Sequence, residues 1–441
     1  MRDLAITFIV FGSLPFILAR PWIGILMWSW LGYMNPHRLA FGFAYSFPFS
    51  EVVAAATFIG LVFARDRRWL PINAVTVTWL LFIAWMTTTT FFAIDPVEGW
   101  AGWDKAMKIQ LFALLTVMLI RTRERLVALV WVIGLSLGFY GLKGGLFVLR
   151  GGGEWRVWGP PGTFITDNNA LALAVIMVLP LLWFLFGATS RRWLRWLIAA
   201  AMILSCASVL GSHSRGAALA GGLMVCFLWL KGSRKGLIGM AIALVLPVLV
   251  LSMPQKWFDR MGTVSSFEQD TSALGRLHAW QFAIEMAVQR PIGGGFGSFT
   301  EENYRRFAPD VVREIEGLGD TRFQEAHSIY FKVLGDHGFP GLILFLALAV
   351  ATYRSAGSVI RQARDSPQLQ WAGNLAAMAQ VSMVGFAIGG AFLGLSYFDL
   401  YYHLVAIIVV LRSVVDETVI EPVPAVVEAA PAATDAQVAG S

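Results

Sequence analysis

Long apolar runs recur along almost the whole chain, and this repetition limits its fold more than any other feature. An α-helix needs about 20 residues to cross the roughly 30 Å hydrocarbon core of a bilayer. Only 14% of the 441 residues are charged and 57% are apolar, against about 25% charged in soluble domains. This excludes a soluble globular protein and predicts an all-α, polytopic transmembrane bundle. Thirteen runs approach or reach the required length: 3–19, 21–35, 50–65, 74–94, 107–120, 126–149, 169–187, 194–212, 215–231, 236–252, 328–351, 373–395 and 398–412.

Proline and basic residues set the expected topology of these runs. Pro15 and Pro21 interrupt the first pair, so we expect about 12 spans, with one early run broken or re-entrant. Basic knots separated by even numbers of runs predict a shared cytoplasmic side. Because the net charge of +6 comes from these knots, the sequence gives no indication of nucleic-acid binding. The basic segments are Arg65–Arg68, Arg121–Arg125, Arg191–Arg195, Lys231–Lys235 and Arg354–Arg364.

The long polar segments between and after the apolar runs divide the chain into four expected parts. Residues 1–252 form N-terminal transmembrane helices, 253–326 a periplasmic cap loop, 327–412 C-terminal transmembrane helices and 413–441 a disordered cytoplasmic tail. The cap is rich in aromatic residues and contains a predicted amphipathic helix from Ser272 to Gln289, ending before Pro291. A folded cap over the outer membrane face suggests a covered site.

Two arginines are candidate anion ligands on this outer side. Arg215 follows the short turn that begins at Gly211, and its planar guanidinium suits phosphate oxygens, although a snorkelling interfacial arginine is the plainer interpretation. Arg276 and Trp280 share one face of the cap helix, where Arg276 also fits a structural role. The glycines after Pro291 lack the ending of a nucleotide-binding loop and predict a close-packed turn.

Two histidines are candidate bases. His327 opens a span within reach of water, and an imidazole accepts a proton from a hydroxyl near neutral pH. His337 lies ten residues further, about 15 Å deeper in a continuous helix. Lys332 and Asp336 form an expected (i, i+4) pair that neutralises two buried charges.

A polar loop that ends at Asn168 and Asn169 enters another span. Capping of the following helix accounts for one asparagine, and the other fits binding of a sugar or phosphate. Other chemistries leave no trace in the sequence: it has no metal-ligand spacing, no nucleophile elbow, no dinucleotide fingerprint and no inverted pair of broken helices typical of transporters. Cys206 and Cys226 lie inside apolar runs and are expected to pack there.

Taken together, these residues resemble the O-antigen ligase and polymerase superfamily of bacterial inner-membrane glycosyltransferases. The ligase pattern His-[Asn/Ser/Gln]-x9-Gly-x-x-[Gly/Thr/Tyr] is met by His327, Ser328, Gly338 and Gly341, and Ser214-Arg215-Gly216 matches a second family element. A third element, Arg followed by Trp and then by Pro-x-x-Gly-x-Gly, is similar to Arg276, Trp280 and the segment from Pro291. The first hundred residues, with Arg20-Pro21-Trp22, look like the ligase branch found beside exosortase systems.

The resemblance implies a ligase in the Gram-negative inner membrane with its active site facing the periplasm. The donor would be a glycan on undecaprenyl diphosphate, the acceptor a lipid A-core sugar hydroxyl, and no metal or nucleotide cofactor is expected. Inverting transfer would use His327 or His337 as base. The implied catalytic residues are His327, Arg215 and Arg276, and the implied substrate-binding residues are Arg215, Arg276, Trp280, Asn168, Asn169 and His337.

Three alternatives stay open. A polymerase would use a second lipid-linked repeat as acceptor, and a protein O-oligosaccharyltransferase would use Ser or Thr. A transporter of lipid-linked saccharides would move the donor without cleaving it.

Overall fold

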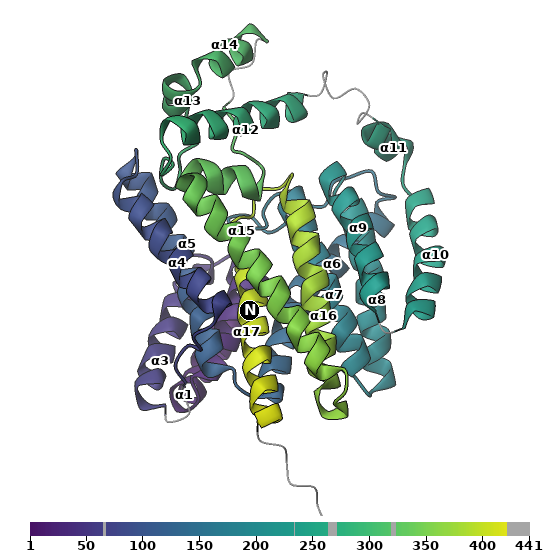
Figure 1. Cartoon of the computed structure of the whole chain (residues 1–441). Coiled ribbons are helices and arrows are strands. Elements are labelled where there is room, and N and C mark those ends of the chain that lie inside the picture. Colours follow the sequence, from purple (N-terminus) through teal and green to yellow (C-terminus); the bar gives the residue numbers. More distant parts are fainter. Residues whose placement is uncertain (65–67, 233, 263–270, 319–322, 421–441) are drawn as a thin grey trace, which may run out of the picture.

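The computed structural model describes residues 1–64, 68–232, 234–262, 271–318 and 323–420, and the elements found there are helical (Figure 1). One helix occupies each of the thirteen predicted apolar runs. These helices are α1 (Arg2–Ala19), α2 (Trp22–Met34), α3 (Phe49–Phe63), α4 (Ala74–Phe91), α5 (Pro96–Leu119), α6 (Arg123–Arg150), α7 (Asn168–Ala188), α8 (Arg192–Leu210), α9 (Arg215–Lys231), α10 (Lys235–Leu251), α15 (Ile329–Ala363), α16 (Gln370–Gly390) and α17 (Asp399–Ile420).

Helix α7 lies at the centre of the bundle. It is apolar on every face, as expected for a helix enclosed by other helices, and it packs against α6, α8, α9 and α16. Small residues bring neighbouring helices close: a Cβ at Gly145 of α6 would lie only 2.1 Å from the Leu204 carbonyl oxygen of α8. Helix α15 packs on α4, α16 and α17, which completes the wall around the core.

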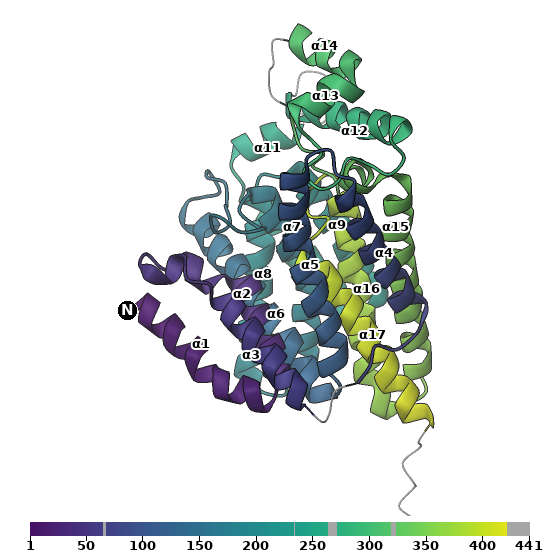
Figure 2. The ribbon, with the colours of Figure 1, turned by 90° about the vertical axis from the view of Figure 1, so that its left-hand side faces the viewer.

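The first three helices form a smaller unit at the side of the bundle (Figure 2). They share an apolar cluster that includes Val10, Ile17 and Val53. Pro15 lies inside a continuous α1 and Pro21 separates α1 from α2, so neither run is broken internally. In the described part of the chain, seven helices are long and apolar enough to cross a membrane, and shorter apolar helices add to them. The expected number of spans stays a prediction.

The cap predicted for residues 253–326 consists of short helices above one end of the bundle (Figure 1). The predicted helix from Ser272 to Gln289 is confirmed as α12 (Thr271–Gln289), and Phe282 of this helix stacks on Tyr304 with ring centroids 4.0 Å apart. This aromatic core explains why the segment folds. The other cap helices are α11 (Gln255–Gly262), α13 (Glu301–Phe307) and α14 (Pro309–Gly317).

The basic knots gather at the end of the bundle opposite the cap, as their spacing predicts. Arg123, Lys231 and Arg234 line one cavity there, and Arg68 lies with Arg121 in another. Residues 65–67 of the first knot lie outside the described residues. The described basic knots therefore share one end of the bundle, as the sequence predicts.

Two predicted boundaries are wrong. Helix α5 begins at Pro96 and not near residue 107, because the Asp95 carboxylate caps it by accepting the Val97 and Glu98 N–H groups. Its charged first turns rise beyond the apolar run. Helix α17 continues past Arg412 to Ile420, where an ion pair between Arg412 and Asp416 stabilises it. Of the predicted disordered tail, residues 413–420 are thus helical, and 421–441 lie outside the described residues.

Candidate active site

A cavity of about 450 Å³ lies beneath the cap, where five segments distant in sequence meet. Its walls come from the first turns of α5, the residues that lead into α7, the cap loop at Phe296 and Gly297, the segment from Glu325 into α15, and the connection between α16 and α17. The wall combines apolar residues with ionisable groups of both charge signs. The ionisable and polar lining residues are Glu98, Lys105, Asp167, Asn169, Glu325, His327, Lys332, Asp336, Ser396 and Tyr397.

His327 faces this cavity from a strained backbone position. Its φ of 42° lies in the left-handed region, which costs a residue with a Cβ of the order of 1 kcal/mol or more and often marks functional sites. The neighbouring Ala326 carbonyl oxygen accepts a hydrogen bond of 2.8 Å from the Trp280 indole N–H, which fixes the segment against α12. The backbone that carries His327 is therefore tied to the cap.

The surroundings of His327 keep its imidazole neutral. Loss of hydration among the crowded segments lowers the pKa of His327 below its usual value, and the positive charge of Arg276 lowers it further. The carboxylates of Asp167 and Glu325 oppose this shift without reversing it. At neutral pH the ring is unprotonated and can accept a proton.

Arg276 and Trp280 lie near His327 on the predicted cap helix, α12. Arg276 lies close enough to His327 for its positive charge to lower the pKa of that imidazole. The Trp280 ring stacks on Phe331 of α15, with centroids 4.8 Å apart, and also contacts Phe392, at 6.3 Å. These contacts hold the arginine-bearing helix over the mouth of the bundle.

Arg215 begins α9 at the same end of the molecule. The preceding turn is tied down from three sides: the Gly211 carbonyl oxygen accepts the Val157 N–H at 3.0 Å, and the Ser212 carbonyl oxygen accepts the Asn168 side-chain N–H at 2.7 Å. Trp257 of the cap donates to the carbonyl oxygen of Leu210 at 2.9 Å. The segment that precedes Arg215 is thus rigidly attached to both α7 and the cap.

Phe392 connects the two arginine-bearing elements. A Cβ at Gly216, the residue after Arg215, would lie 3.0 Å from the Phe392 Cβ, and the Phe392 ring contacts Trp280. A single side chain thus bridges α9 and α12. Arg215 and Arg276 are half-buried on these neighbouring elements, although neither lines the cavity itself.

Neither Asn168 nor Asn169 is the N-terminal capping residue of α7. Asp167 caps α7 by accepting the Asn169 and Ala170 N–H groups at 2.8 and 3.0 Å, so the capping prediction for Asn168 or Asn169 is wrong. A carboxylate one residue earlier competes better for the positive end of the helix. Asn168 is buried and braces the Arg215 turn, whereas Asn169 lines the cavity.

The predicted pair of Lys332 and Asp336 is confirmed, with 3.4 Å between the Lys332 Nζ and the Asp336 Oδ1. Lys332 also contacts Glu325 at 2.8 Å. The fully buried Asp336 carboxylate accepts hydrogen bonds from Ser298 at 2.9 Å and Tyr397 at 3.0 Å. Sequence spacing gave no signal for Glu325, Ser298 or Tyr397, because these residues reach the pair only through the packing of separate loops.

His337 lies behind the cavity wall and not on it. The side chain is fully buried, its Nδ1 is 2.7 Å from the Thr89 hydroxyl, and the Phe296 ring packs edge-on against it at 4.6 Å. The helix stays continuous from Ile329 to His337 and deviates at the next residue. The two histidines therefore occupy separate environments.

The glycines after Pro291 form the close-packed turn that the sequence predicts. The N–H groups of Gly294 and Gly295 donate to the carbonyl oxygens of Gly335 and Asp336 at 2.9 and 2.8 Å. On the facing side of this turn, Gly338 of α15 has φ 64° and ψ −168°, a conformation that almost only glycine adopts. A Cβ at Gly338 would lie 1.8 Å from the Pro291 carbonyl oxygen, so a side chain there would separate cap and bundle.

These features define a class: a polytopic helical membrane protein with a capped cavity that carries ionisable groups at one end. Two stretches of the chain match known families. Residues 200–346 match the family described as O-Antigen ligase, and residues 1–190 match a family of unknown function, DUF5935. No curated protein matches the chain.

The O-antigen ligase domain runs from α8 into α15 and contains Arg215, Arg276 and His327. It supports a place for the chain in the O-antigen ligase/polymerase superfamily of membrane glycosyltransferase-type enzymes, which act on lipid-linked glycans.

Proposed function

We propose that this protein is an O-antigen ligase that transfers a glycan from undecaprenyl diphosphate to a lipid A-core sugar hydroxyl at the periplasmic face of the Gram-negative inner membrane. One observation carries the proposal: His327 faces a capped cavity of about 450 Å³, and the positive charge of Arg276 acts on its imidazole. The O-antigen ligase match over the same residues supports glycan transfer as the reaction. The ligase branch found beside exosortase systems stays a prediction for the N-terminal region.

In the proposed reaction, His327 is the general base. As the acceptor oxygen attacks the anomeric carbon of the donor, its proton passes to the imidazole. The bond between the anomeric carbon and the diphosphate oxygen breaks in the same displacement, so undecaprenyl diphosphate leaves and the anomeric configuration inverts. The lowered pKa of His327 supports this role, because only the unprotonated ring can accept the proton.

Arg215 and Arg276 hold the leaving diphosphate in this proposal. Guanidinium groups bind phosphate oxygens through paired hydrogen bonds and stabilise the charge that develops on the leaving group. Trp280 supports the position of both His327 and Arg276 through its hydrogen bond to Ala326. No divalent ion is needed in this scheme, so chelation with EDTA leaves the transfer rate unchanged.

The remaining candidates act at different distances from the substrate. Asn169 lines the cavity and binds a sugar hydroxyl, whereas Asn168 positions the Arg215 turn through Ser212. His337 is buried behind the wall and positions the segment that carries Asp336. The base role therefore goes to His327 in preference to His337.

The decisive experiment measures release of undecaprenyl diphosphate from a purified lipid-linked donor by the full-length protein in detergent. We expect release that depends on lipid A-core. Release that requires a second lipid-linked repeat would identify a polymerase, and release that requires an acceptor protein would identify a protein O-oligosaccharyltransferase. With all three acceptors present, an intact donor would contradict glycan transfer and favour a transporter.

A further inference from the structure

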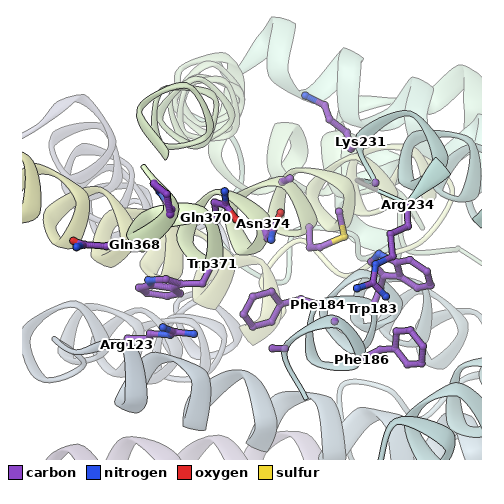
Figure 3. A pocket seen from close by; sticks show the side chains of 16 residues that line it. Arg123, Trp183, Phe184, Phe186, Lys231, Arg234, Gln368, Gln370, Trp371 and Asn374 are labelled. Carbon is purple, nitrogen blue, oxygen red and sulfur yellow. The ribbon is translucent and has the colours of Figure 1, made fainter. Parts of the chain in front are cut away.

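A second cavity of about 450 Å³ lies at the end of the bundle opposite the cap, and the proposed reaction makes no use of it. It is bounded by the starts of α6 and α16 and by the ends of α7 and α9. Figure 3 shows basic side chains around it, with Arg123 beside Trp371 on one side and Lys231 and Arg234 on the other. Its polar side chains are three cations and three amides: Arg123, Lys231, Arg234, Gln368, Gln370 and Asn374.

None of the three cations forms an ion pair within the described part of the chain, although the charge of Arg123 acts on the adjacent, exposed Glu124 carboxylate. No ion pair found there involves Arg123, Lys231 or Arg234, and the described residues that line the cavity include no acid. Two of the cations rest on aromatic rings instead: the Arg123 guanidinium carbon lies 5.2 Å from the Trp371 centroid, and the Lys231 Nζ lies 6.0 Å from that of Tyr353. A group of three cations that forms no ion pair among the described residues attracts an anion.

A general excess of basic residues at this end is expected from topology alone, but the cavity adds a specific shape. Arg191 and Arg192 also lie at this end and are exposed, as are Arg123, Lys231 and Arg234, but they do not line the cavity. The cavity residues instead come from separate helices that converge on one space. The amides of Gln370 and Asn374, on the first turns of α16, add neutral donors beside the cations.

The apolar part of the lining favours a lipid over a soluble anion. Trp183 and Phe186 stack with centroids 5.5 Å apart at the end of α7, and both remain half-exposed. Ala377 and Met378 of α16 form another part of the lining. A phosphate with hydroxyl groups fits the cations and amides, whereas acyl chains fit the aromatic edge and the adjoining hydrocarbon.

We propose that this cavity binds the headgroup of an anionic glycerophospholipid. Arg123, Lys231 and Arg234 contact the phosphate, the amides of α16 contact the glycerol hydroxyls, and the acyl chains run along Trp183 and Phe186. The site is separate from the reaction at the capped end, so a bound lipid stabilises the junction of α6, α7, α9 and α16 without taking part in glycan transfer.

Native mass spectrometry of the full-length protein in detergent tests this site by titration with phosphatidylglycerol or phosphatidylcholine. We expect selective retention of phosphatidylglycerol. Near an anionic headgroup each basic side chain contributes about a fivefold factor in affinity, so Arg123→Gln combined with Arg234→Gln lowers affinity about 25-fold. The matched control, Arg191→Gln with Arg192→Gln, removes equal charge from the same end and leaves retention within about twofold.

A second variant separates shape from charge. Asn374→Trp fills the cavity without altering a charged group, and we expect it to weaken phosphatidylglycerol retention as well. Equal retention of the two lipids, or equal loss in the control pair, would overturn the proposal. Displacement of the lipid by equimolar glycerol phosphate would identify a soluble-anion site and overturn the lipid assignment.

Discussion

The two ends of the bundle hold cavities of the same size, about 450 Å³ each, with opposite chemistry. Under the cap, acidic and basic side chains are paired. Lys332 contacts both Glu325 and Asp336, and His327 lies among charges of both signs. At the other end the described lining is basic and amidic, with no acid. A mixed, paired lining supports proton transfer at a positioned group, whereas an unpaired basic lining supports binding of an anion.

We expect the largest loss of transfer activity when the proposed base at the capped end is removed. His327→Gln eliminates the proton acceptor and should lower the transfer rate about 1,000-fold, within the usual range for loss of a general base. Single-turnover conversion of the lipid-linked donor measures this effect. His278→Gln is the matched control, because His278 lies on α12, does not line the cavity and pairs with Glu314 at 3.6 Å; equal loss in both variants would contradict the assignment.

The next largest effect concerns the leaving group. Arg276→Gln removes a guanidinium from the proposed diphosphate site and should lower the transfer rate about 100-fold, comparable with loss of one oxyanion ligand. Arg313→Gln removes a cap arginine paired with Asp310 and should have little effect. If Arg276→Gln retained full activity with normal donor affinity, Arg276 would have no part in the reaction.

The Arg276→Gln variant also tests whether the charge of Arg276 lowers the pKa of His327. Activity requires neutral His327, so it is lost as pH falls through the lowered pKa of this imidazole, below its usual value near 6.5. Removing the Arg276 charge raises that pKa, so the acidic limb of the normalised pH–rate profile should move to higher pH. An acidic limb that stays in place would show that another group titrates.

Gly338 tests the connection between cap and bundle. Gly338→Ala forces a side chain to φ 64° and ψ −168°, where its Cβ would meet the Pro291 carbonyl oxygen. We expect a loss of about 2 kcal/mol or more in unfolding free energy, measured by thermal denaturation in detergent. Gly236→Ala, in open space on α10, should be neutral or slightly stabilising; equal stability of the two variants would contradict the described packing.

The smallest expected effect lies at the basic end. The pair Arg123→Gln and Arg234→Gln should leave glycan transfer in detergent within about twofold of the unmodified protein, since neither residue belongs to the capped cavity. A large loss of transfer would show that the two ends are coupled.

The sequence predicted the helices well because each crossing requires a long apolar run, and the cap helix because its pattern ends cleanly before Pro291. It failed at α5, where a capping carboxylate starts the helix before the apolar run begins. The predicted tail boundary at Arg412 failed for a similar reason, since α17 continues through a polar ion pair. The pattern of apolar residues indicates which parts of a helix are buried. It does not detect the first turns of α5 or the last turns of α17, because these turns are helical but polar.

The candidate site was predictable only where residues form local patterns. Arg215, Arg276 and His327 stand in short motifs, and the pair of Lys332 and Asp336 follows from helical spacing. Tyr397 and Glu325 reach the cavity through loops whose approach depends on the packing of α15, α16 and α17, which no local pattern reports.

The most direct test of the central assignment is undecaprenyl diphosphate release by the unmodified protein and by His327→Gln, each with purified donor and lipid A-core. We expect equimolar release and glycosylated lipid A-core with the unmodified protein, and neither product above background with the folded variant. Equal release by both proteins would contradict His327 as the base.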